Sequence, residues 1–387
     1  MNFPPRIELI ETTARLREFC AQLADAPWIA VDTEFLREKT YYPKFCLAQI
    51  ATQSQVACID PLAIDDLDPL ADVLFHPGTI KIFHAARQDL EVFYHIWKKL
   101  PAPIFDTQIA APLIGLPEQV SYATLVGELL GVSLGKNHTR TDWSARPLSA
   151  AQLRYAADDA IYLAAAYQAL RGRLEALGRL DWLDDEFNAL LDPTLYENSP
   201  EQAWQRIGQA QQLQGRALTA LQTLAAWRED TAREQDIPRG WVLKDEVMLD
   251  LVKLMPNNLD ELRRIRGLDE RALKRYGATL CRLLQQNPEP AQQALEVKAP
   301  PPRRTPEQEA VLDLMSAVVR HRAGQHTLNP AALATRKDLE QLLETPEQSR
   351  LRKGWRRALA GEELEAILRG ECQVTVADGR LQVRHHA

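Results

Sequence analysis

The chain has 387 residues, which at roughly 100–200 residues per domain predicts two to four domains. A hydrophobic content of 45% and a charged content of 26% are ordinary for globular proteins and exclude a chain that is disordered or collagen-like throughout. No apolar run approaches the roughly 20 residues that cross a bilayer, and the charged N-terminal stretch argues against a secretory signal. The five cysteines are scattered without a C-x-x-C pair, so we expect a cytoplasmic protein without a disulfide framework.

The net charge of -7 is distributed unevenly. Residues 1–195 carry 17 Lys and Arg against 26 Asp and Glu, whereas residues 196–387 carry 29 against 27. An acidic first half is unfavourable for a simple basic surface that binds nucleic acid. It is compatible with nucleic acid if some of the carboxylates hold cations, because bound cations invert the local electrostatics.

Residues 1–195 alternate between strand-like and helix-like patterns. Short apolar runs predict strands at 28–31, 47–51, 56–59, 79–83 and 104–105, and a polar turn between the second and third makes these two a hairpin. Helical spacing follows at 66–74, 88–99, 107–115, 121–131 and 150–175, and Ser149 with Gln152 has the spacing of a capping box. This order predicts an α/β domain with a mixed sheet and flanking helices.

The rest of the chain is predicted to be helical, in two domains at 200–290 and 303–387. A segment rich in Pro, Gln and Ala at 287–304 separates them as a linker. Each domain begins with a long helix, continues with a short helix next to a proline and ends in basic segments, so we interpret the two as diverged repeats. The last residues alternate around Asp378-Gly379, which predicts a β-hairpin outside the repeat.

Three weak acidic features occur in the first domain. Asp32 and Glu34 stand two apart at the end of a strand, so both project from one face. Asp89 lies in the first turn of a helix, where acids also favour the helix dipole. Tyr155 and Asp159 are one helical turn apart on one face. Each feature has a structural alternative: a polar turn, a dipole partner and a core tyrosine.

In combination and order, these residues resemble the exonuclease superfamily with four acids and a tyrosine, the DEDDy branch on a ribonuclease-H-like fold. The first motif is Asp32-Thr33-Glu34, the second contains Asp89 and the third is Tyr155-x-x-x-Asp159. The segments 35–43 and 141–148 resemble the bacterial ribonuclease D family in particular, and the two helical domains resemble its tandem HRDC domains. An extra acid, Asp158, leaves the Tyr-to-Asp spacing intact, and we expect it to face solvent or a capping partner.

The resemblance implies a 3′→5′ exoribonuclease that releases 5′-mononucleotides and trims tRNA precursors and other structured RNAs. Four carboxylates without a Cys or His cluster fit two Mg²⁺ or Mn²⁺ ions rather than zinc. By the same resemblance Asp32 would bridge both ions, Glu34 and Asp159 would complete the site of the attacking water, and Asp89 would support the second ion. Tyr155 would orient the water.

Basic and aromatic side chains near the motifs are candidates for RNA binding, since single strands bind through cations and stacking rings. These candidates are Arg37, Lys39, Tyr41, Tyr42, Lys136, Arg140, Trp143 and Arg146. The alternative for the basic residues is a solvated surface, and Arg146 could equally be an internal ion-pair partner. Two further basic runs lie in the helical domains, at 263–275 and 350–357.

Two other functions compete with this interpretation. A DNA-directed 3′→5′ exonuclease would use the same chemistry, although the absence of a G-x-x-x-x-G-K-[ST] loop and of polymerase motifs favours RNA. A non-catalytic RNA-binding protein on a nuclease fold is the alternative from a different class, and the presence of all four acids and the tyrosine argues against it. The sequence indicates no membrane association and no obligate protein partner.

Overall fold

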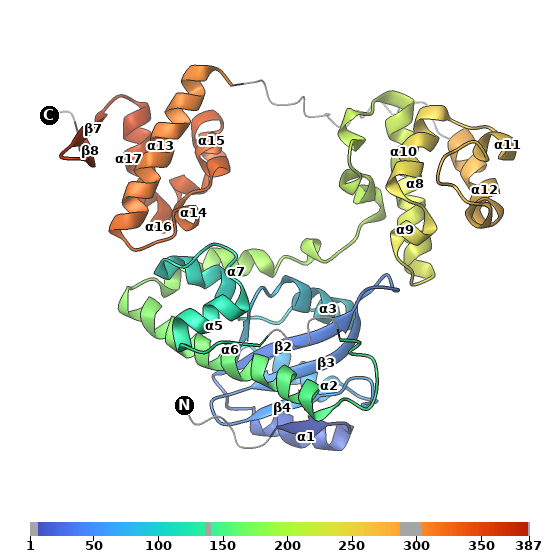
Figure 1. Ribbon diagram of the computed structural model, residues 1–387, viewed down its shortest axis with the longest axis horizontal. Helices are drawn as coiled ribbons and strands as arrows, with labels where there is room; N and C mark the ends of the chain where they lie inside the picture. Colours follow the sequence, from blue (N-terminus) through green and yellow to red (C-terminus); the bar gives the residue numbers. More distant parts are fainter. Residues whose placement is uncertain (1–6, 136–140, 287–303, 386–387) are drawn as a thin grey trace.

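The computed structural model describes residues 7–135, 141–286 and 304–385, and its first part is an α/β unit on a single six-stranded sheet (Figure 1). The strand order is β1-β4-β3-β2-β5-β6. The pairs β2–β3 and β3–β4 are antiparallel, whereas β1–β4, β2–β5 and β5–β6 are parallel, so the mixed sheet is confirmed. The strands are β1 Glu8–Ile10, β2 Trp28–Leu36, β3 Lys44–Ala51, β4 Val56–Ile59, β5 Ile80–Phe83 and β6 Ile104–Asp106.

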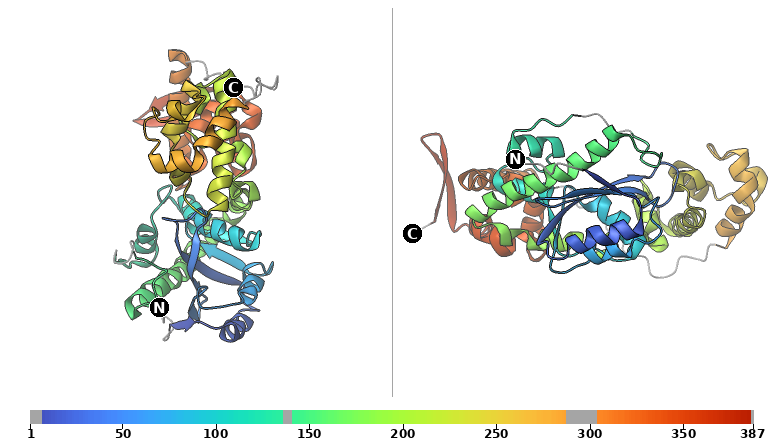
Figure 2. Two further views of the ribbon diagram at one scale, coloured as in Figure 1. Left: turned by 90° about the vertical axis from the view of Figure 1, so that its right-hand side faces the viewer. Right: turned by 90° about the horizontal axis from the view of Figure 1, so that it is seen from below.

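Helices cover both faces of this sheet (Figure 2). The central strand alternates accordingly: Ala30 packs in the cluster under α6, whereas Ile29 and Val31 pack in the cluster with α1, α2 and α3. The predicted helices are present with bounds close to those expected, and α1 was not predicted. The helices of the unit are α1 Thr13–Gln22, α2 Asp68–Leu74, α3 Arg87–Trp97, α4 Thr107–Ala110, η1 Ala111–Ile114, α5 Tyr122–Leu130 and α6 Ala150–Ala176.

The 27-residue helix α6 packs on the sheet through an inner face that contains small residues. Ala156, Ala157 and Ala160 are fully buried against β2, β3 and β4. The helix starts at the predicted capping box, in which Ser149 and Gln152 each satisfy the other's backbone N–H. The start of the helix is therefore determined locally.

Two helical units follow a series of short helical segments. We call α8–α12 the first helical unit and α13–α17 the second helical unit. In each, the first helix has 20 residues and the second has 4, which agrees with the repeat expected from the sequence. The predicted hairpin around Gly379 is also confirmed. The elements are α7 Asp184–Leu190, α8 Gly215–Glu234, α9 Arg239–Val242, α10 Asp245–Leu254, α11 Leu259–Leu262, α12 Glu270–Gln285, α13 Pro306–Gln325, α14 Pro330–Leu333, α15 Arg336–Glu344, α16 Gly354–Arg356, α17 Glu362–Leu368, β7 Cys372–Ala377 and β8 Arg380–His385; short helices designated η occur at 180–183, 193–195, 200–206, 210–212, 346–348, 350–352 and 357–361.

One difference from the predicted helical domain lies in its basic run at 350–357, which does not form one regular helix. The structure instead has a 3-10 turn, α16 and a five-residue π-helical segment that ends at Gly361. A Cβ on Gly361 would lie 1.8 Å from the carbonyl oxygen of Leu351. The chain therefore packs backbone against backbone here, a constraint that the helical spacing of the side chains does not reveal.

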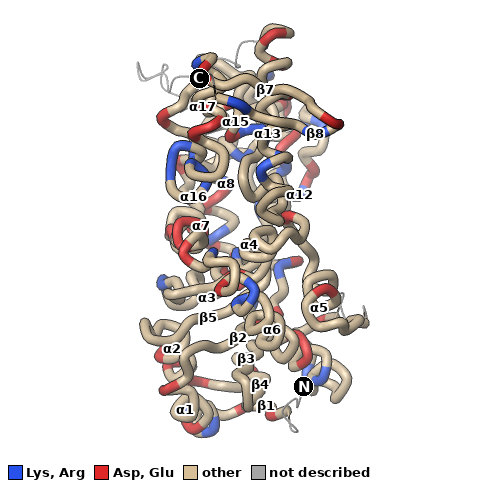
Figure 3. Tube along the Cα trace, turned by 90° about the vertical axis from the view of Figure 1, so that its left-hand side faces the viewer, with Lys and Arg blue, Asp and Glu red and all other residues tan. Residues whose placement is uncertain are grey.

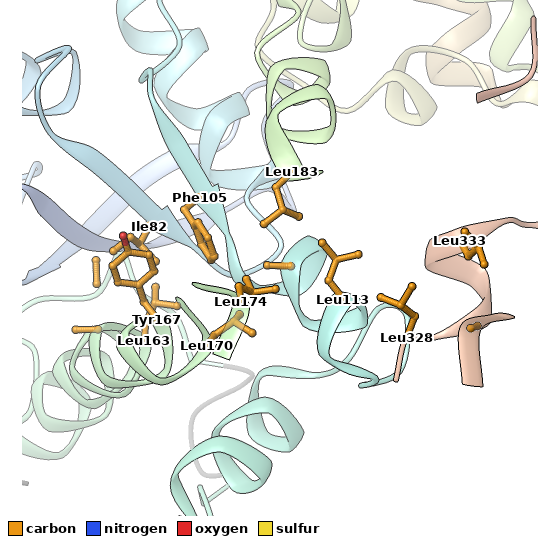
Figure 4. Packing of buried hydrophobic residues seen from close by; sticks show 14 of the residues in the cluster. Ile82, Phe105, Leu113, Leu163, Tyr167, Leu170, Leu174, Leu183, Leu328 and Leu333 are labelled. Atoms are coloured by element: carbon orange, nitrogen blue, oxygen red, sulfur yellow. The ribbon is translucent and has the colours of Figure 1, made fainter. Parts of the chain in front are cut away.

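The second helical unit shares a hydrophobic core with the α/β unit. Buried residues run from Tyr167 on α6 through Leu113 to Leu328 and Leu333 of the second unit (Figure 4). Trp182 and Trp355 stack at 4.6 Å between ring centroids, with planes 7° apart. Among the described residues, no helix is long and apolar enough to cross a membrane.

The first helical unit contacts the α/β unit at the loop between β2 and β3. The hydroxyl of Tyr41 donates to the buried carboxylate of Glu229 on α8, which also pairs with Arg239. The backbone N–H groups of Tyr41 and Tyr42 donate to Asp236 at 3.0 and 3.2 Å. The strand that carries Asp32 and Glu34 is thus continuous with the loop that holds the first helical unit.

Candidate active site

Strand β2 presents two carboxylates on the α6 face of the sheet. The pairing of β2 with β5 runs from Trp28 to Ala30 and ends there. Asp32 and Glu34 therefore lie beyond the paired residues, next to the carboxyl end of β5. Asp32 and Glu34 share the face of Ala30 because side chains alternate along a strand. The sequence placed them after the strand; the structure places them inside it, with a bulge at Glu34–Phe35.

Helix α6 adds the third carboxylate, Asp159. One ligand oxygen each from Asp32, Glu34 and Asp159 lies within 4.8 Å of the others. Tyr155, one turn earlier, shares a hydrogen bond with Asp159, and its ring packs against Trp143 at 6.3 Å. The neighbouring Asp158 pairs with Arg154 at 2.9 Å, an ion pair within α6 rather than the solvent or capping contact that we expected.

Asp89 approaches from α3, on the opposite face of the sheet. Its carboxylate accepts a hydrogen bond of 2.5 Å from Thr33, the residue between the two acids of β2. The start of α3 is held by Asp106, which accepts from the backbone N–H groups of Ala85 and Ala86 at 3.1 and 2.8 Å. Ala85 has a φ of 60°, a left-handed backbone conformation that residues other than glycine rarely adopt. The hydrogen bonds from Asp106 hold the backbone in this conformation.

Burial and mutual repulsion perturb these acids strongly. Burial, followed by repulsion from Asp32, Asp159 and Asp89, raises the pKa of Glu34 to about 9. Burial raises the pKa of Asp32 to about 7, and burial with repulsion from Asp32 raises the pKa of Asp159 to about 8. Carboxylates this close cannot all ionise at neutral pH unless a cation compensates them. The all-oxygen donor set fits hard divalent ions.

Sequence reasoning did not identify Tyr122, which supports the cluster from α5. Its hydroxyl donates to the backbone carbonyl oxygen of Asp159, and its ring lies 5.3 Å from that of His84. His84 is itself held between Thr107, at 3.0 Å, and the Val120 carbonyl, at 3.1 Å. A tyrosine at the first position of an apolar helix carries no sequence signal for this role.

Two residues predicted to bind RNA have structural roles instead. Trp143 is 4% exposed in the core, where it contacts Tyr155, so no base can stack on it. Arg146 forms two hydrogen bonds with the buried Asp60, at 2.5 and 2.8 Å, and also donates to the carbonyls of Trp143 and Cys46. The ion-pair alternative for Arg146 is therefore the correct one.

The other RNA-binding candidates divide into three groups. Arg37 and Lys39 are exposed, and Arg37 pairs with Glu91 at 2.6 Å. Tyr41 contacts the first helical unit, and Tyr42 stacks on His95 of α3 at 3.8 Å. Lys136 and Arg140 lie outside the described residues.

The two basic runs of the helical units differ in how their charges are used. Around α16, Lys and Arg lie beside acidic segments (Figure 3): Arg356 pairs with Glu186 of α7, and Arg350 pairs with Asp338. Five exposed cations on and before α12 have no ion pair among the described residues. We call these the exposed basic run: Arg264, Arg266, Arg271, Lys274 and Arg275.

Comparisons with known proteins agree with this architecture. Residues 7–175 match a family described as 3′-5′ exonuclease, and residues 217–284 match the HRDC domain. The chain is 38% identical to a ribonuclease D of Gluconacetobacter diazotrophicus, covering 98% of this chain and 97% of that protein. It is 37% identical to a ribonuclease D of Sphingobium indicum over 97% of this chain and 98% of the relative.

Solved structures give the same result. The crystal structure of Escherichia coli RNase D, an exoribonuclease involved in structured RNA processing, superposes with a TM-score of 0.79 at 34% identity, covering 94% of this chain and 99% of that chain. The catalytic core of RRP6 from Trypanosoma brucei gives a TM-score of 0.58 at 25% identity, over 72% of this chain and 79% of that chain. The HRDC match covers the first helical unit only.

Proposed function

This chain belongs to the ribonuclease D family and is a 3′→5′ exoribonuclease, and we propose that the cluster of Asp32, Glu34 and Asp159 holds its metal ions. The observation that carries the proposal is the convergence of these three carboxylates within 4.8 Å, between β2 and α6. Asp89, held by Thr33 on the other side of β2, is the fourth acid of the site.

The ions we propose are two Mg²⁺ or Mn²⁺, because every candidate ligand atom is a carboxylate oxygen. When bound, such ions neutralise the charge of a phosphodiester and acidify water for its hydrolysis. The raised pKa values of Asp32, Glu34 and Asp159 support this proposal, since each acid is destabilised as an anion in the absence of a cation.

Tyr155 has the geometry of a hydrogen-bond donor that orients the attacking water. Burial, together with repulsion from Asp159 and Glu34, raises the pKa of its hydroxyl above the ordinary value. The hydroxyl therefore keeps its proton at neutral pH and acts by position rather than as a base. Its packing against the buried Trp143 fixes the ring, which limits the loss of side-chain entropy when water and RNA bind.

The substrate we propose is a structured RNA with a 3′ extension, in particular a tRNA precursor. The catalytic unit is acidic, so the positive charge that attracts the RNA backbone has to come from elsewhere. The exposed basic run supplies it from the first helical unit, which matches the HRDC domain. The second helical unit uses its basic residues in ion pairs, so we assign it a structural role.

We divide the chain into an exonuclease domain at 1–195, a first HRDC domain at 200–290 and a second HRDC-like domain at 303–387. The equal lengths of α8 and α13, and of α9 and α14, support a common origin for the two helical domains. The hairpin β7–β8 has no counterpart among the described residues of the first helical unit.

The test is digestion of a tRNA precursor with extra 3′ residues, labelled at its 5′ end, in Mg²⁺, Mn²⁺ or EDTA. We expect stepwise shortening with either ion, release of 5′-mononucleotides and no reaction in EDTA. Asp32→Asn should remove nearly all activity while circular dichroism stays unchanged. Full activity of this variant, purified free of wild-type enzyme, would end the proposed mechanism.

The same assay separates the alternative functions. Faster digestion of a matched DNA strand than of the RNA would favour a DNA-directed exonuclease. RNA binding without any nucleotide release in either ion would identify a non-catalytic protein. The relationship to ribonuclease D and the presence of all four acids favour neither alternative.

A further inference from the structure

Gln49, in the middle of β3, is a buried polar residue whose side-chain amide has no hydrogen-bond partner among the described residues. The residue is 0% exposed. Within the part of the chain that the structure describes, neither its Nε2 nor its Oε1 makes a hydrogen bond. A buried amide without hydrogen bonds is strongly destabilising, and native proteins seldom retain one without a reason.

The sheet register places Gln49 directly beside the carboxylate cluster. In the antiparallel pair β2–β3, Gln49 is the register partner of Asp32. Residues opposite each other in such a pair project on the same face, with their Cβ atoms roughly 4.5–5.5 Å apart. Gln49 therefore shares the α6 face with Asp32 and is its immediate neighbour across the strands.

Of the residues directly beside Gln49 in the sheet and above it on α6, only Asp32 carries a carboxylate. On β4, the other neighbour of β3, the register partner of Gln49 is Cys58. The thiol of Cys58 already donates to the carbonyl of Leu153 at 3.8 Å. Above it, α6 contributes the fully buried Ala156 and Ala157. The Asp32 carboxylate is thus the acceptor that the sheet register places beside the amide.

We propose that Gln49 is a positioning residue that donates its Nε2–H to the Asp32 carboxylate when that carboxylate binds cations. The inference rests on the proposed metal site. A metal-ligating carboxylate is commonly oriented by a hydrogen bond from a neighbour, and loss of such a neighbour typically lowers metal affinity by about 10–100-fold. Gln49 would orient Asp32 from β3, whereas Asp159 approaches from α6.

The test is Gln49→Met, which keeps the length of the side chain and removes its polar atoms. Mn²⁺ binding to the full chain, measured by titration calorimetry, should weaken by about 10–100-fold. In EDTA the variant should unfold at a higher temperature than wild type, because the unpaired amide is gone. The turnover number on a short single-stranded RNA should fall while its KM stays unchanged.

Cys58→Ala is the matched control, since Cys58 occupies the adjacent position in the same row across the sheet. It should bind Mn²⁺ as wild type does. Equal Mn²⁺ affinity in Gln49→Met and wild type would overturn the inference, as would a lower unfolding temperature of that variant in EDTA, which would indicate an ordinary structural glutamine. If wild type itself binds no Mn²⁺, the proposed metal site fails, which is a distinguishable result.

Discussion

Replacing Glu34 by glutamine should stabilise the metal-free protein while abolishing its activity. The pKa of Glu34 is raised from its ordinary value of 4.5 to about 9, first by burial and then by Asp32, Asp159 and Asp89. Between these two pH values the folded chain keeps a proton that the unfolded chain has released. Stability contributed by this group is therefore complete below pH 4.5 and is lost as the pH rises towards 9.

The magnitude follows from the size of the shift. Each pH unit in this interval removes about 1.4 kcal/mol of unfolding free energy, which amounts to about 3 kcal/mol at pH 7. Glutamine resembles the protonated acid in shape and cannot ionise, so it avoids this loss. For a domain of this size, the unfolding midpoint should rise by roughly 6–12 °C at pH 7.

The assay is scanning calorimetry in EDTA at pH 5, 6, 7 and 8, following the transition of the exonuclease domain. The difference between Glu34→Gln and wild type should be small at pH 5 and grow steadily with pH. Glu38→Gln, an exposed site four residues along the chain, serves as the control and should have no effect. In Mn²⁺ the wild type should unfold at a higher temperature than Glu34→Gln, because bound ions stabilise the wild type. A pH-independent difference in EDTA would refute the electrostatic reasoning.

Three further predictions follow from the same geometry. Tyr155→Phe should lower the turnover number at least tenfold and leave RNA affinity within about twofold, which single-turnover kinetics and binding titration can separate. Alanine replacement of all five residues of the exposed basic run should weaken binding of a tRNA precursor. The slope of log binding constant against log salt concentration should become shallower by about 0.7–0.9 per lost phosphate contact, while a short single strand is still digested. An unchanged slope would exclude this surface as an RNA contact. Tyr41→Phe together with Asp236→Ala should detach the first helical unit from the β2–β3 loop, increasing protease cleavage between residues 196 and 215 without changing the circular dichroism spectrum.

The α/β architecture and the acidic positions were predictable because their signals are local. Alternation of buried residues, the capping box at Ser149 and the i, i+4 spacing of Tyr155 and Asp159 all appear in short windows of sequence. Their predicted roles as metal ligands depend on family resemblance, since the sequence alone does not reveal that α6 and β2 approach each other. The small side chains of Ala156 and Ala157 favour close packing of this helix on a sheet, but their size does not say which strand lies beneath it.

Predictions failed where the role of a side chain is set by contacts outside its own segment. Trp143 and Arg146 have the composition of an RNA-binding loop, yet one is buried beside Tyr155 and the other is bonded to Asp60, 86 residues earlier. Tyr122 and Gln49 were missed for the same reason. Their importance comes from the surrounding packing. It brings the backbone carbonyl of Asp159 next to Tyr122, and Asp32 next to Gln49.

The candidate metal site depends on the packing of α6 against the sheet. Asp159 belongs to the helix and Asp32 to the sheet, so their carboxylates stay together only while the alanine face of α6 remains packed on the strands. Enlarging Ala156 or Ala160 by even one branched side chain would lift the helix and spread the ligands. On heating, the ions should consequently dissociate as soon as α6 begins to separate from the sheet, at temperatures where the strands themselves are still paired.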